Sequence, residues 1–234
     1  MAARADGKKL TRAVVVQAAL DVLDRDGIEG LTVRTLAATL EVKAPALYWH
    51  VRDKQDLLDE MGTEIWRRVG DELAALPPDI TWDDEATAFA EITRNALLSH
   101  RDGAKVFSGT YLTDGTILAR QESSLGRWLA QGFTVADVVR AFTLLNSFVT
   151  GFCVEQQAVD QADDDRYSLE TRNERVGAEA HPLTAAAGAE LAQEADIRFA
   201  DLLGLVVETI GHMRDAHRDT STPSAAPRRE KHDG

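Results

Sequence analysis

Three ring side chains stand side by side at Tyr48, Trp49 and His50, and all of them combine a flat ring with a polar tip. Consecutive residues of a helix point in different directions, so the three rings cannot all enter one small core. At least one ring must therefore face outward, where its polar tip can reach a phosphate group. This cluster indicates a surface that contacts nucleic acid.

Two short helices joined by a tight turn are predicted to position these rings. Thr32 is a suitable N-cap, and apolar residues follow at helical spacing, at Leu31, Leu36, Ala37 and Leu40. Residues 41 to 43 form the turn, and a second helix begins near Ala44, carries Pro45 in its first turn and runs to about Val51. This pattern is typical of a helix-turn-helix, which places its second helix in the major groove of DNA. An ordinary buried helical hairpin is the alternative that spacing alone leaves open.

The stretch from residue 31 to 54 resembles the DNA-reading domain of the TetR family, and LYWHV followed by Arg52, Asp53 and Lys54 resembles the tetracycline repressors within it. The resemblance continues upstream, where residues 11 to 27 form a first helix capped by Thr11 and stopped by Gly27. Downstream it includes HRDGAKV at 100 to 106 and EQQ at 155 to 157, whereas residues 158 to 193 match weakly.

The resemblance implies a role for each residue of the reading surface. Arg34 matches an arginine that reads a guanine, whose O6 and N7 acceptors suit the planar guanidinium, with a surface salt bridge as the alternative. Lys54 matches a phosphate-binding lysine that follows a helix cap. For Trp49, packing against the supporting helix is the alternative to a DNA contact. The predicted DNA-binding residues are Thr32, Arg34, Ala44, Pro45, Ala46, Tyr48, Trp49, His50 and Lys54.

The reading surface also departs from the tetracycline repressors. They carry glutamine and threonine where this chain has Ala44 and Ala46, and threonine where it has Val33. Those polar contacts to bases are lost. We therefore expect a palindromic operator that keeps the guanine read by Arg34 but differs from the tetracycline operator.

Charge and helical periodicity divide the chain. Its net charge is −13, but residues 1 to 54 hold nine Lys and Arg against seven Asp and Glu, a net +2, so the remaining 180 residues carry −15. The sequence predicts an all-α protein with a three-helix helix-turn-helix domain at 1–56, whose residues 1–9 form a basic arm. A helical domain for ligand binding and dimerisation follows at 57–218, and a disordered tail at 219–234. The basic arm either touches DNA or is a solvated terminus.

Four longer helices are predicted after residue 53. A connector covers 54 to 75 and ends before Pro77, and a second helix runs from Trp82 to about Ser99 after a Thr81 cap. The segments 136–156 and 194–215 are apolar, and the resemblance implies that they form the interface of a homodimer. Residues 158 to 185 are expected to be solvated or mobile and could gate a pocket.

No enzyme signature is present. The six histidines are scattered, and the sequence contains neither a glycine-rich phosphate loop nor a cysteine pair with metal spacing. His100 is expected to be a surface or capping residue, and Cys153 a small core residue. No apolar run approaches a membrane span and the N-terminus lacks a signal peptide, so we expect a cytoplasmic protein without cofactor.

Phe107 stands where tetracycline repressors carry the histidine that binds magnesium, although Glu155 still matches their glutamate. The resemblance places a ligand pocket at Phe89, Thr93, Phe107, Thr110, Tyr111, Leu112, Ser124 and Glu155, with Gln121 as a further polar candidate. These residue types favour a flat, largely apolar effector held without metal, or else they fill a core. The predicted protein is a ligand-released transcriptional repressor. A DNA-binding activator or ligand-independent regulator, and a helical small-molecule-binding protein or enzyme, remain alternatives.

Overall fold

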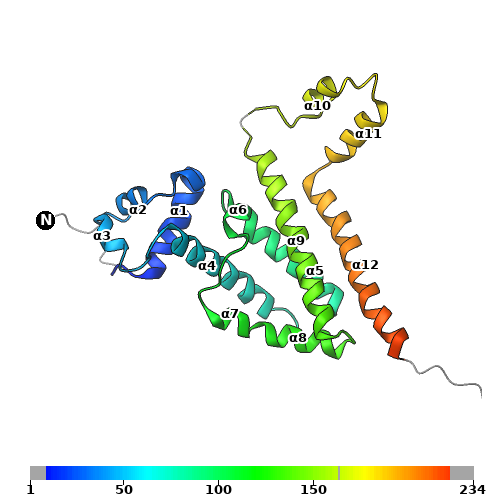
Figure 1. Cartoon of the computed structure of the whole chain (residues 1–234), viewed down its shortest axis with the longest axis horizontal. Helices are drawn as coiled ribbons and strands as arrows, with labels where there is room; N and C mark the ends of the chain where they lie inside the picture. The colour runs from blue at the N-terminus through cyan, green and yellow to red at the C-terminus, as the bar shows by residue number, and fades with distance from the viewer. Residues whose placement is uncertain (1–8, 163, 222–234) are drawn as a thin grey trace, which may run out of the picture.

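The computed structural model describes residues 9–162 and 164–221, of which 217–221 by backbone alone, and every regular element in these ranges is a helix. The predicted all-α fold is confirmed. In chain order the helices are α1 (Arg12–Gly30), α2 (Val33–Thr39), α3 (Ala44–Leu47), α4 (Lys54–Ala74), α5 (Trp82–Leu98), α6 (Gly103–Phe107), α7 (Gly115–Ala119), α8 (Gln121–Ala130), α9 (Val135–Asp160), α10 (Leu169–Val176), α11 (Pro182–Leu191) and α12 (Ala195–Ser221). Figure 1 shows α1 to α3 as a small head on the left of a larger helical body.

The predictions for the two ends of the chain concern residues most of which the structure does not describe. The basic arm at 1–9 lies outside the described residues except for Lys9, and the tail predicted at 219–234 lies outside them from 222 onward. α12 continues to Ser221. The division of the chain at residue 56 stays a prediction, and it falls within the first turn of α4, which begins at Lys54.

The head consists of α1, α2 and α3, and its predicted caps are present. The side-chain oxygen of Thr11 accepts the N–H of Val14 at 3.3 Å, and that of Thr32 accepts the N–H of Thr35 at 3.1 Å. Gly27 has a left-handed φ of 71°, which interrupts α1 at the residue where the sequence predicted its end. The chain then makes one further turn to Gly30.

α3 is shorter than predicted, because it ends at Leu47 and not near Val51. The Asp56 carboxylate accepts the backbone N–H of Arg52 at 2.9 Å, and the Asp53 side chain accepts the N–H of Asp56 at 2.8 Å. These two carboxylates belong to the start of α4. They hold the chain at Arg52 and Asp53 ahead of α4, and Tyr48, Trp49 and His50 lie in a turn that the N–H of Val51 closes onto the carbonyl of Leu47 at 3.0 Å.

α4 is the element that connects the head to the body. It packs against α1 of the head and against α5, α6 and α7 of the body. Its residues Leu57, Met61 and Ile65 are buried in the continuous hydrophobic core. A displacement of any of these neighbours therefore acts on a single helix of 21 residues.

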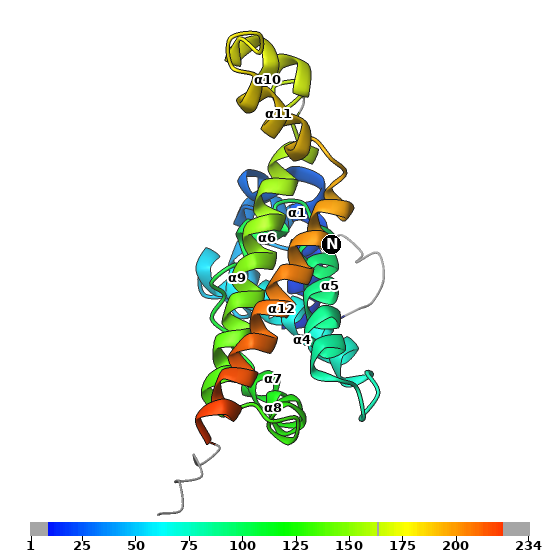
Figure 2. The ribbon, with the colours of Figure 1, turned by 90° about the vertical axis from the view of Figure 1, so that its right-hand side faces the viewer.

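Three long helices form the frame of the body. α5 packs against α9, and α12 packs against both of them, as the two ribbon views show (Figures 1 and 2). The sequence predicted no apolar run of membrane-spanning length, but by length and composition α9 is apolar enough to cross a membrane, a test that the core helix of a soluble protein also passes. The buried residues Leu145, Val149 and Phe199 place the apolar faces predicted for α9 and α12 partly in the core.

α10 and α11 form a hairpin between α9 and α12 that projects from the end of the body (Figures 1 and 2). They pack mainly against each other, and most of their side chains are half-buried or exposed. The segment 158–185, predicted to be solvated or mobile, includes the last turn of α9, all of α10 and the first turn of α11.

Candidate nucleic-acid interface and ligand cavity

The exposed surface of the head contains the residues that the sequence singled out. The backbone turn between α2 and α3 includes Glu41 with a left-handed φ of 53°, and the N–H of Val42 returns to the carbonyl of Ala37 at 3.0 Å. This turn packs the two helices through buried Leu36 and Leu47. The result is a helix-turn-helix in which α3 and the turn after it face outward.

The aromatic cluster does not pack into the head. Trp49 is 88% exposed and Tyr48 is 55% exposed, whereas His50 is half-buried. The alternative in which the indole of Trp49 packs against its support does not fit this exposure. Two large rings held in water are costly unless something covers them, so this surface has the character of a binding site.

Charged and small residues complete the same surface. Arg34 is exposed in the first turn of α2, and in the described part of the chain its side chain forms no hydrogen bond or ion pair. Lys54 is exposed at the start of α4, with its Nζ 3.4 Å from the carbonyl oxygen of Ile28. Thr32 and Pro45 are exposed, while Ala44 and Ala46 are half-buried. The two charges lie at helix N-termini, where backbone N–H groups add to the attraction for phosphate.

The body contains a cavity of about 760 Å³ that is partly open to solvent. Its walls come from α4, α5, α6, α7, α8, α9 and the loop after α6. Of the residues predicted for the pocket, those that line it are Phe89, Phe107, Thr110, Leu112 and Ser124, together with Gln121. Because apolar side chains make up most of the wall, the cavity suits a largely apolar molecule.

Three predicted pocket residues do not line the cavity. Tyr111 is 74% exposed in the loop after α6, and Glu155 is exposed on α9. Thr93 is buried in α5, where its Oγ1 forms no hydrogen bond with the described residues. Neighbours in sequence such as Tyr111 and Leu112 point to opposite sides of an extended segment, so only one of them can face the cavity.

The polar corner of the cavity was not predicted from the sequence. Glu85 of α5 is 2% exposed and accepts hydrogen bonds from Ser124 Oγ at 2.6 Å, Arg127 Nε at 3.0 Å and Trp128 Nε1 at 3.1 Å. Arg127 Nη2 donates a further bond at 2.5 Å, and this bonding to Glu85 raises the pKa of the guanidinium. The partners lie about 40 residues from Glu85 in the chain, so no local spacing could reveal the cluster.

The donor set of the cavity does not fit a magnesium chelate. Among the described residues, Glu85 is the only acidic side chain in the wall, and its oxygens are occupied by Ser124, Arg127 and Trp128. Phe107, 1% exposed, lines the wall without a ligand atom. The described residues contain no group of three His, Cys, Asp or Glu side chains in metal-binding geometry. Hard cations favour carboxylate oxygens among their ligands, and among the described residues this wall offers no carboxylate that is free of other partners.

The joint between the head and the body corrects the prediction for His100. This residue was expected to be a surface or capping residue, but it is buried, with Nδ1 3.0 Å from the carboxylate of Asp24 on α1. The Asp24 carboxylate also accepts the N–H of Arg101 at 3.1 Å, and Asp102 accepts the N–H of Ile28 at 3.1 Å. The turn between α5 and α6 is covered by the end of α1, a packing that the sequence of either segment alone does not reveal.

Comparisons with known proteins agree with this arrangement. Residues 15–61 match the family described as bacterial regulatory proteins, tetR family, and residues 74–213 match the tetracyclin repressor-like C-terminal domain. The class D tetracycline repressor of Escherichia coli is 37% identical over 166 residues, which cover 70% of this chain and 75% of that protein.

Two solved structures are also similar. A possible TetR family transcriptional regulator from Streptomyces coelicolor A3(2) superposes with a TM-score of 0.76 and 33% identity, over 87% of this chain and all of that one. A class A TetR in complex with 5a,6-anhydrotetracycline and magnesium has a TM-score of 0.65 and 27% identity, over 87% of this chain and 99% of that one.

The helix-turn-helix head and the helical body with its cavity thus define a DNA-binding regulator, a class distinct from enzymes. The chain belongs to the TetR family. Within that family it is a ligand-responsive transcriptional repressor.

Proposed function

We propose that this repressor acts in the cytoplasm as a homodimer, binds a palindromic operator through α3 and the turn after it, and releases the operator when a flat, largely apolar effector enters the cavity without a metal ion. The carrying observation is the contrast within one chain between exposed Tyr48 and Trp49 on the head and the 760 Å³ cavity in the body. The first suits a DNA surface and the second a small molecule.

The reading surface supports recognition of both backbone and bases. Lys54 and the N-terminus of α4 provide a phosphate site, and Arg34 offers an unpaired guanidinium fork for a guanine. Ala44 and Ala46 provide only methyl groups, which suit contact with a thymine methyl and not a bidentate hydrogen bond. The proposed operator therefore keeps a guanine but differs from the tetracycline operator.

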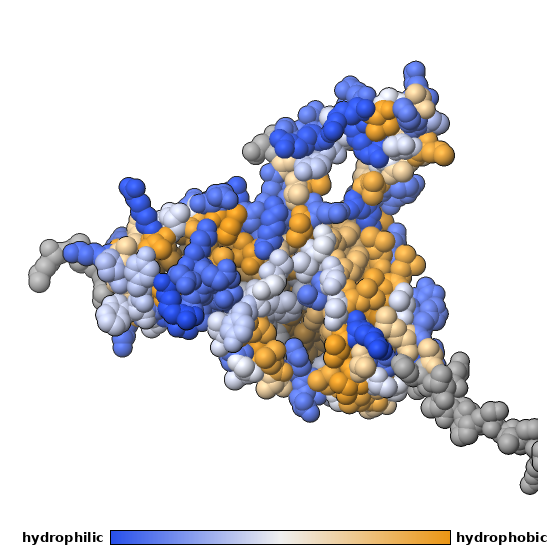
Figure 3. Space-filling view, viewed as in Figure 1, coloured by the Kyte–Doolittle hydropathy of each residue, from blue (hydrophilic) through white to orange (hydrophobic). Residues whose placement is uncertain are grey.

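An apolar face on α9 and α12 supports the homodimer. Exposed apolar residues run along the two helices at Val135, Val139, Val159, Ile197, Leu202 and Leu205. Figure 3 shows apolar surface gathered over α9 and α12 on the right of the molecule. A second copy of the same two helices would cover this face in a four-helix arrangement and would present two heads to the two halves of a palindrome.

The operator is tested by selecting duplexes from random DNA with the purified protein. We expect an inverted repeat with a guanine in each half and an affinity that falls steeply with salt, because lysines and arginines displace counterions from phosphate. An Arg34→Ala protein serves as the control and is expected to lose the preference for that guanine. Recovery of an asymmetric sequence, or of no sequence at all, counts against the proposal.

The dimer is tested by placing a charge on the exposed apolar face. Leu205 is 60% exposed on α12, and Leu205→Asp is expected to give a monomer in sedimentation measurements and to weaken operator binding. Leu183→Asp is the matched control, since Leu183 is an exposed leucine on α11 outside that face. A dimer that survives Leu205→Asp, or an equal loss with Leu183→Asp, contradicts the assignment of the interface.

The metal-free effector is tested by calorimetry with anhydrotetracycline and with 2-naphthol, each in magnesium and in EDTA. We expect binding of at least one of these flat molecules to be the same in both buffers. Binding that collapses in EDTA would show that a metal ion is required.

A further inference from the structure

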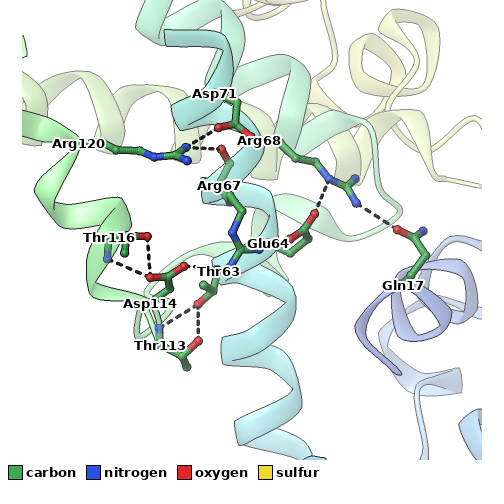
Figure 4. Close-up of polar contacts among 10 residues, drawn as sticks. All are labelled: Gln17, Thr63, Glu64, Arg67, Arg68, Asp71, Thr113, Asp114, Thr116 and Arg120. Carbon is green, nitrogen blue, oxygen red and sulfur yellow. Dashed lines mark hydrogen bonds and ion pairs between the residues drawn. The ribbon is translucent and has the colours of Figure 1, made fainter. Parts of the chain in front are cut away.

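A continuous chain of polar contacts crosses α4 from the cavity side to the head side. Figure 4 shows Glu64, Arg67 and Arg68 on α4, with Asp114 of α7 on one side and Gln17 of α1 on the other. Glu64 lies one helical turn before both arginines, pairs with Arg67, and accepts from Arg68 Nε at 3.1 Å. One carboxylate therefore fixes two guanidinium groups that point in different directions.

On the cavity side, Arg67 reaches the start of α7. Its Nη2 donates to Asp114 Oδ2 at 3.2 Å, while the other oxygen of Asp114 caps α7 by accepting from the Thr116 N–H at 2.9 Å and hydroxyl at 2.7 Å. The hydrogen bonds from Thr116 lower the pKa of Asp114 most, and the hydrogen bond from Arg67 lowers it further below its ordinary value. Asp114 is therefore charged at neutral pH and remains an ion-pair partner for Arg67.

The same side of α4 is tied to the wall of the cavity. Arg120, which lines the cavity, donates to Asp71 at 2.5 Å and lies 3.5 Å from the carbonyl oxygen of Arg67. Thr63 Oγ1 accepts the N–H of Thr113 at 3.0 Å, in the segment that leads from the cavity loop to α7. Any molecule that shifts α7 or Arg120 from inside the cavity therefore acts on α4 at these contacts.

On the head side, Arg68 reaches α1. Its Nη2 donates to Gln17 Oε1 at 3.1 Å, and the Gln17 amide in turn donates to Asp21 Oδ1 at 2.9 Å. The side chains of Glu64, Arg67 and Arg68 are 29%, 36% and 42% exposed, so each ion pair by itself contributes little to stability. These ion pairs matter because they connect neighbouring elements. Arg67 pairs with the two acidic residues Asp114 and Glu64, and Glu64 pairs with the two basic residues Arg67 and Arg68.

We infer that Arg67, Glu64 and Arg68 form a relay that sets the position of the head according to the position of α7, and that they are positioning residues for DNA binding. When α7 moves, Arg67 loses Asp114 and pairs with Glu64 alone. Glu64 then holds Arg68 less firmly, and the contact of Arg68 with Gln17 changes. This relay rests on the proposed function, in which the cavity takes an effector and the head reads DNA.

A double-mutant cycle tests the relay, because independent contacts give additive effects and a shared pathway does not. Asp114→Asn keeps the helix cap but removes the charge that holds Arg67, and Arg68→Met removes the contact with Gln17. Affinity is measured for the operator recovered by selection with the wild-type protein. The control is Arg175→Met, an exposed arginine on α10 far from this chain of contacts in Figure 1.

We expect each single change to lower operator affinity by about 5-fold, the low end of ordinary coupling between sites, and the double change to lower it no further. Thermal unfolding is expected to shift by no more than about 3 °C, since the pairs are partly exposed. Arg175→Met is expected to change neither the operator affinity nor the unfolding temperature. A double variant that loses about 25-fold, the product of two independent 5-fold effects, or single variants that bind normally, would overturn the relay.

A second readout does not depend on DNA. Spin labels at Ala38→Cys on α2 and Gly126→Cys on α8 report the distance between head and body, because both positions are exposed and Gly126 has open space around an added Cβ. Labelled chains are mixed with excess unlabelled chains so that only distances within one chain are seen. We expect the distance distribution to be broader in Asp114→Asn and in Arg68→Met than in the wild type. The double variant is expected to show the same broadening as either single variant, and Arg175→Met is expected to show none.

The two readouts separate the relay from the proposed function. If selection recovers no operator but the distributions broaden as expected, the proposed function fails, while the coupling of the head position to α7 through these residues stands. If the operator is found and the distributions of Asp114→Asn and Arg68→Met match the wild type, the relay is overturned while DNA binding stands.

Discussion

Two groups of aromatic residues in this chain have opposite surroundings. Tyr48 and Trp49 are consecutive residues that lie exposed on the head. Phe89, Phe142 and Trp128 come from three helices of the body, and their ring centroids lie 4.9 Å and 5.1 Å apart in successive pairs. The head presents its rings to solvent, whereas in the body Phe89 and Phe142 line the cavity and buried Trp128 packs against Phe142.

The difference shows what each region is built to contact. The exposed rings lie on the same head as exposed Arg34 and Lys54, and this local charge suits DNA. The rings of Phe89 and Phe142, packed edge to face in the wall of the cavity, favour a flat apolar molecule. The surface suited to DNA and the site suited to a small molecule thus lie in different regions of the chain, and α4 connects the two regions.

Truncating one tryptophan from each group of aromatic residues is expected to give the largest difference in stability. Trp128→Ala is expected to lower the free energy of unfolding by about 4 kcal/mol, because a fully buried indole is removed, whereas Trp49→Ala is expected to change it by less than about 0.5 kcal/mol. Urea unfolding followed by circular dichroism measures both. Equal losses would mean that Trp49 is part of a core.

The polar corner of the cavity gives the next largest effect. Glu85→Ala leaves Arg127, Ser124 and the Trp128 indole without their acceptor, so we expect a loss of about 3 kcal/mol in urea unfolding. Glu155→Ala, at an exposed glutamate of α9, is the control and is expected to be neutral within about 0.5 kcal/mol. A neutral Glu85→Ala would show that this corner does not hold α5 and α8 together.

Two substitutions in the head sharpen the distinction between reading and docking. Arg34→Ala is expected to cost about 2 kcal/mol of binding to the selected operator and to relax the preference at one base pair in each half. Lys54→Ala is expected to weaken binding to all sequences alike and to reduce the slope of affinity against salt by about one. Fluorescence anisotropy with matched and single-base-changed duplexes measures both. If the two variants behave identically, Arg34 does not read a base.

Cys153 gives the smallest effect, and it belongs to the body. Burial raises the pKa of its thiol to about 11, from an ordinary value of 9.0. The unfolded thiol therefore ionises first, so its contribution to stability is complete below pH 9 and is lost as the pH rises towards 11. We expect a loss of roughly 1 kcal/mol by pH 10, relative to Cys153→Ala measured in the same series. Parallel pH profiles of the two proteins would contradict this.

The sequence predicted the parts of the molecule that depend on local spacing. Thr11, Thr32 and Thr81 cap their helices as predicted, because a cap is decided within four residues. Gly27 interrupts α1 for the same local reason. The resemblance to the family began from one contiguous stretch, residues 31 to 54, and the all-α fold followed from the helical spacing of apolar residues along the rest of the chain.

The sequence could not predict the parts that depend on tertiary packing. His100 is buried because α1 covers it, 76 residues away in the chain. Glu85 acquired its role from Ser124 and Arg127, which belong to another helix. The orientation of Tyr111, which is exposed while Leu112 lines the cavity, depends on how the loop after α6 lies on α4.

Release of DNA by a metal-free ligand is the most direct test of the account. A labelled operator duplex bound to the protein in EDTA is titrated with 2-naphthol, a hydroxyanthraquinone and anhydrotetracycline while its fluorescence anisotropy is followed. We expect at least one of these flat molecules to lower the anisotropy to the value of free DNA, and we expect the same release in EDTA as in magnesium. Release that requires tetracycline with magnesium, or DNA that stays bound when calorimetry shows the cavity occupied, would contradict it.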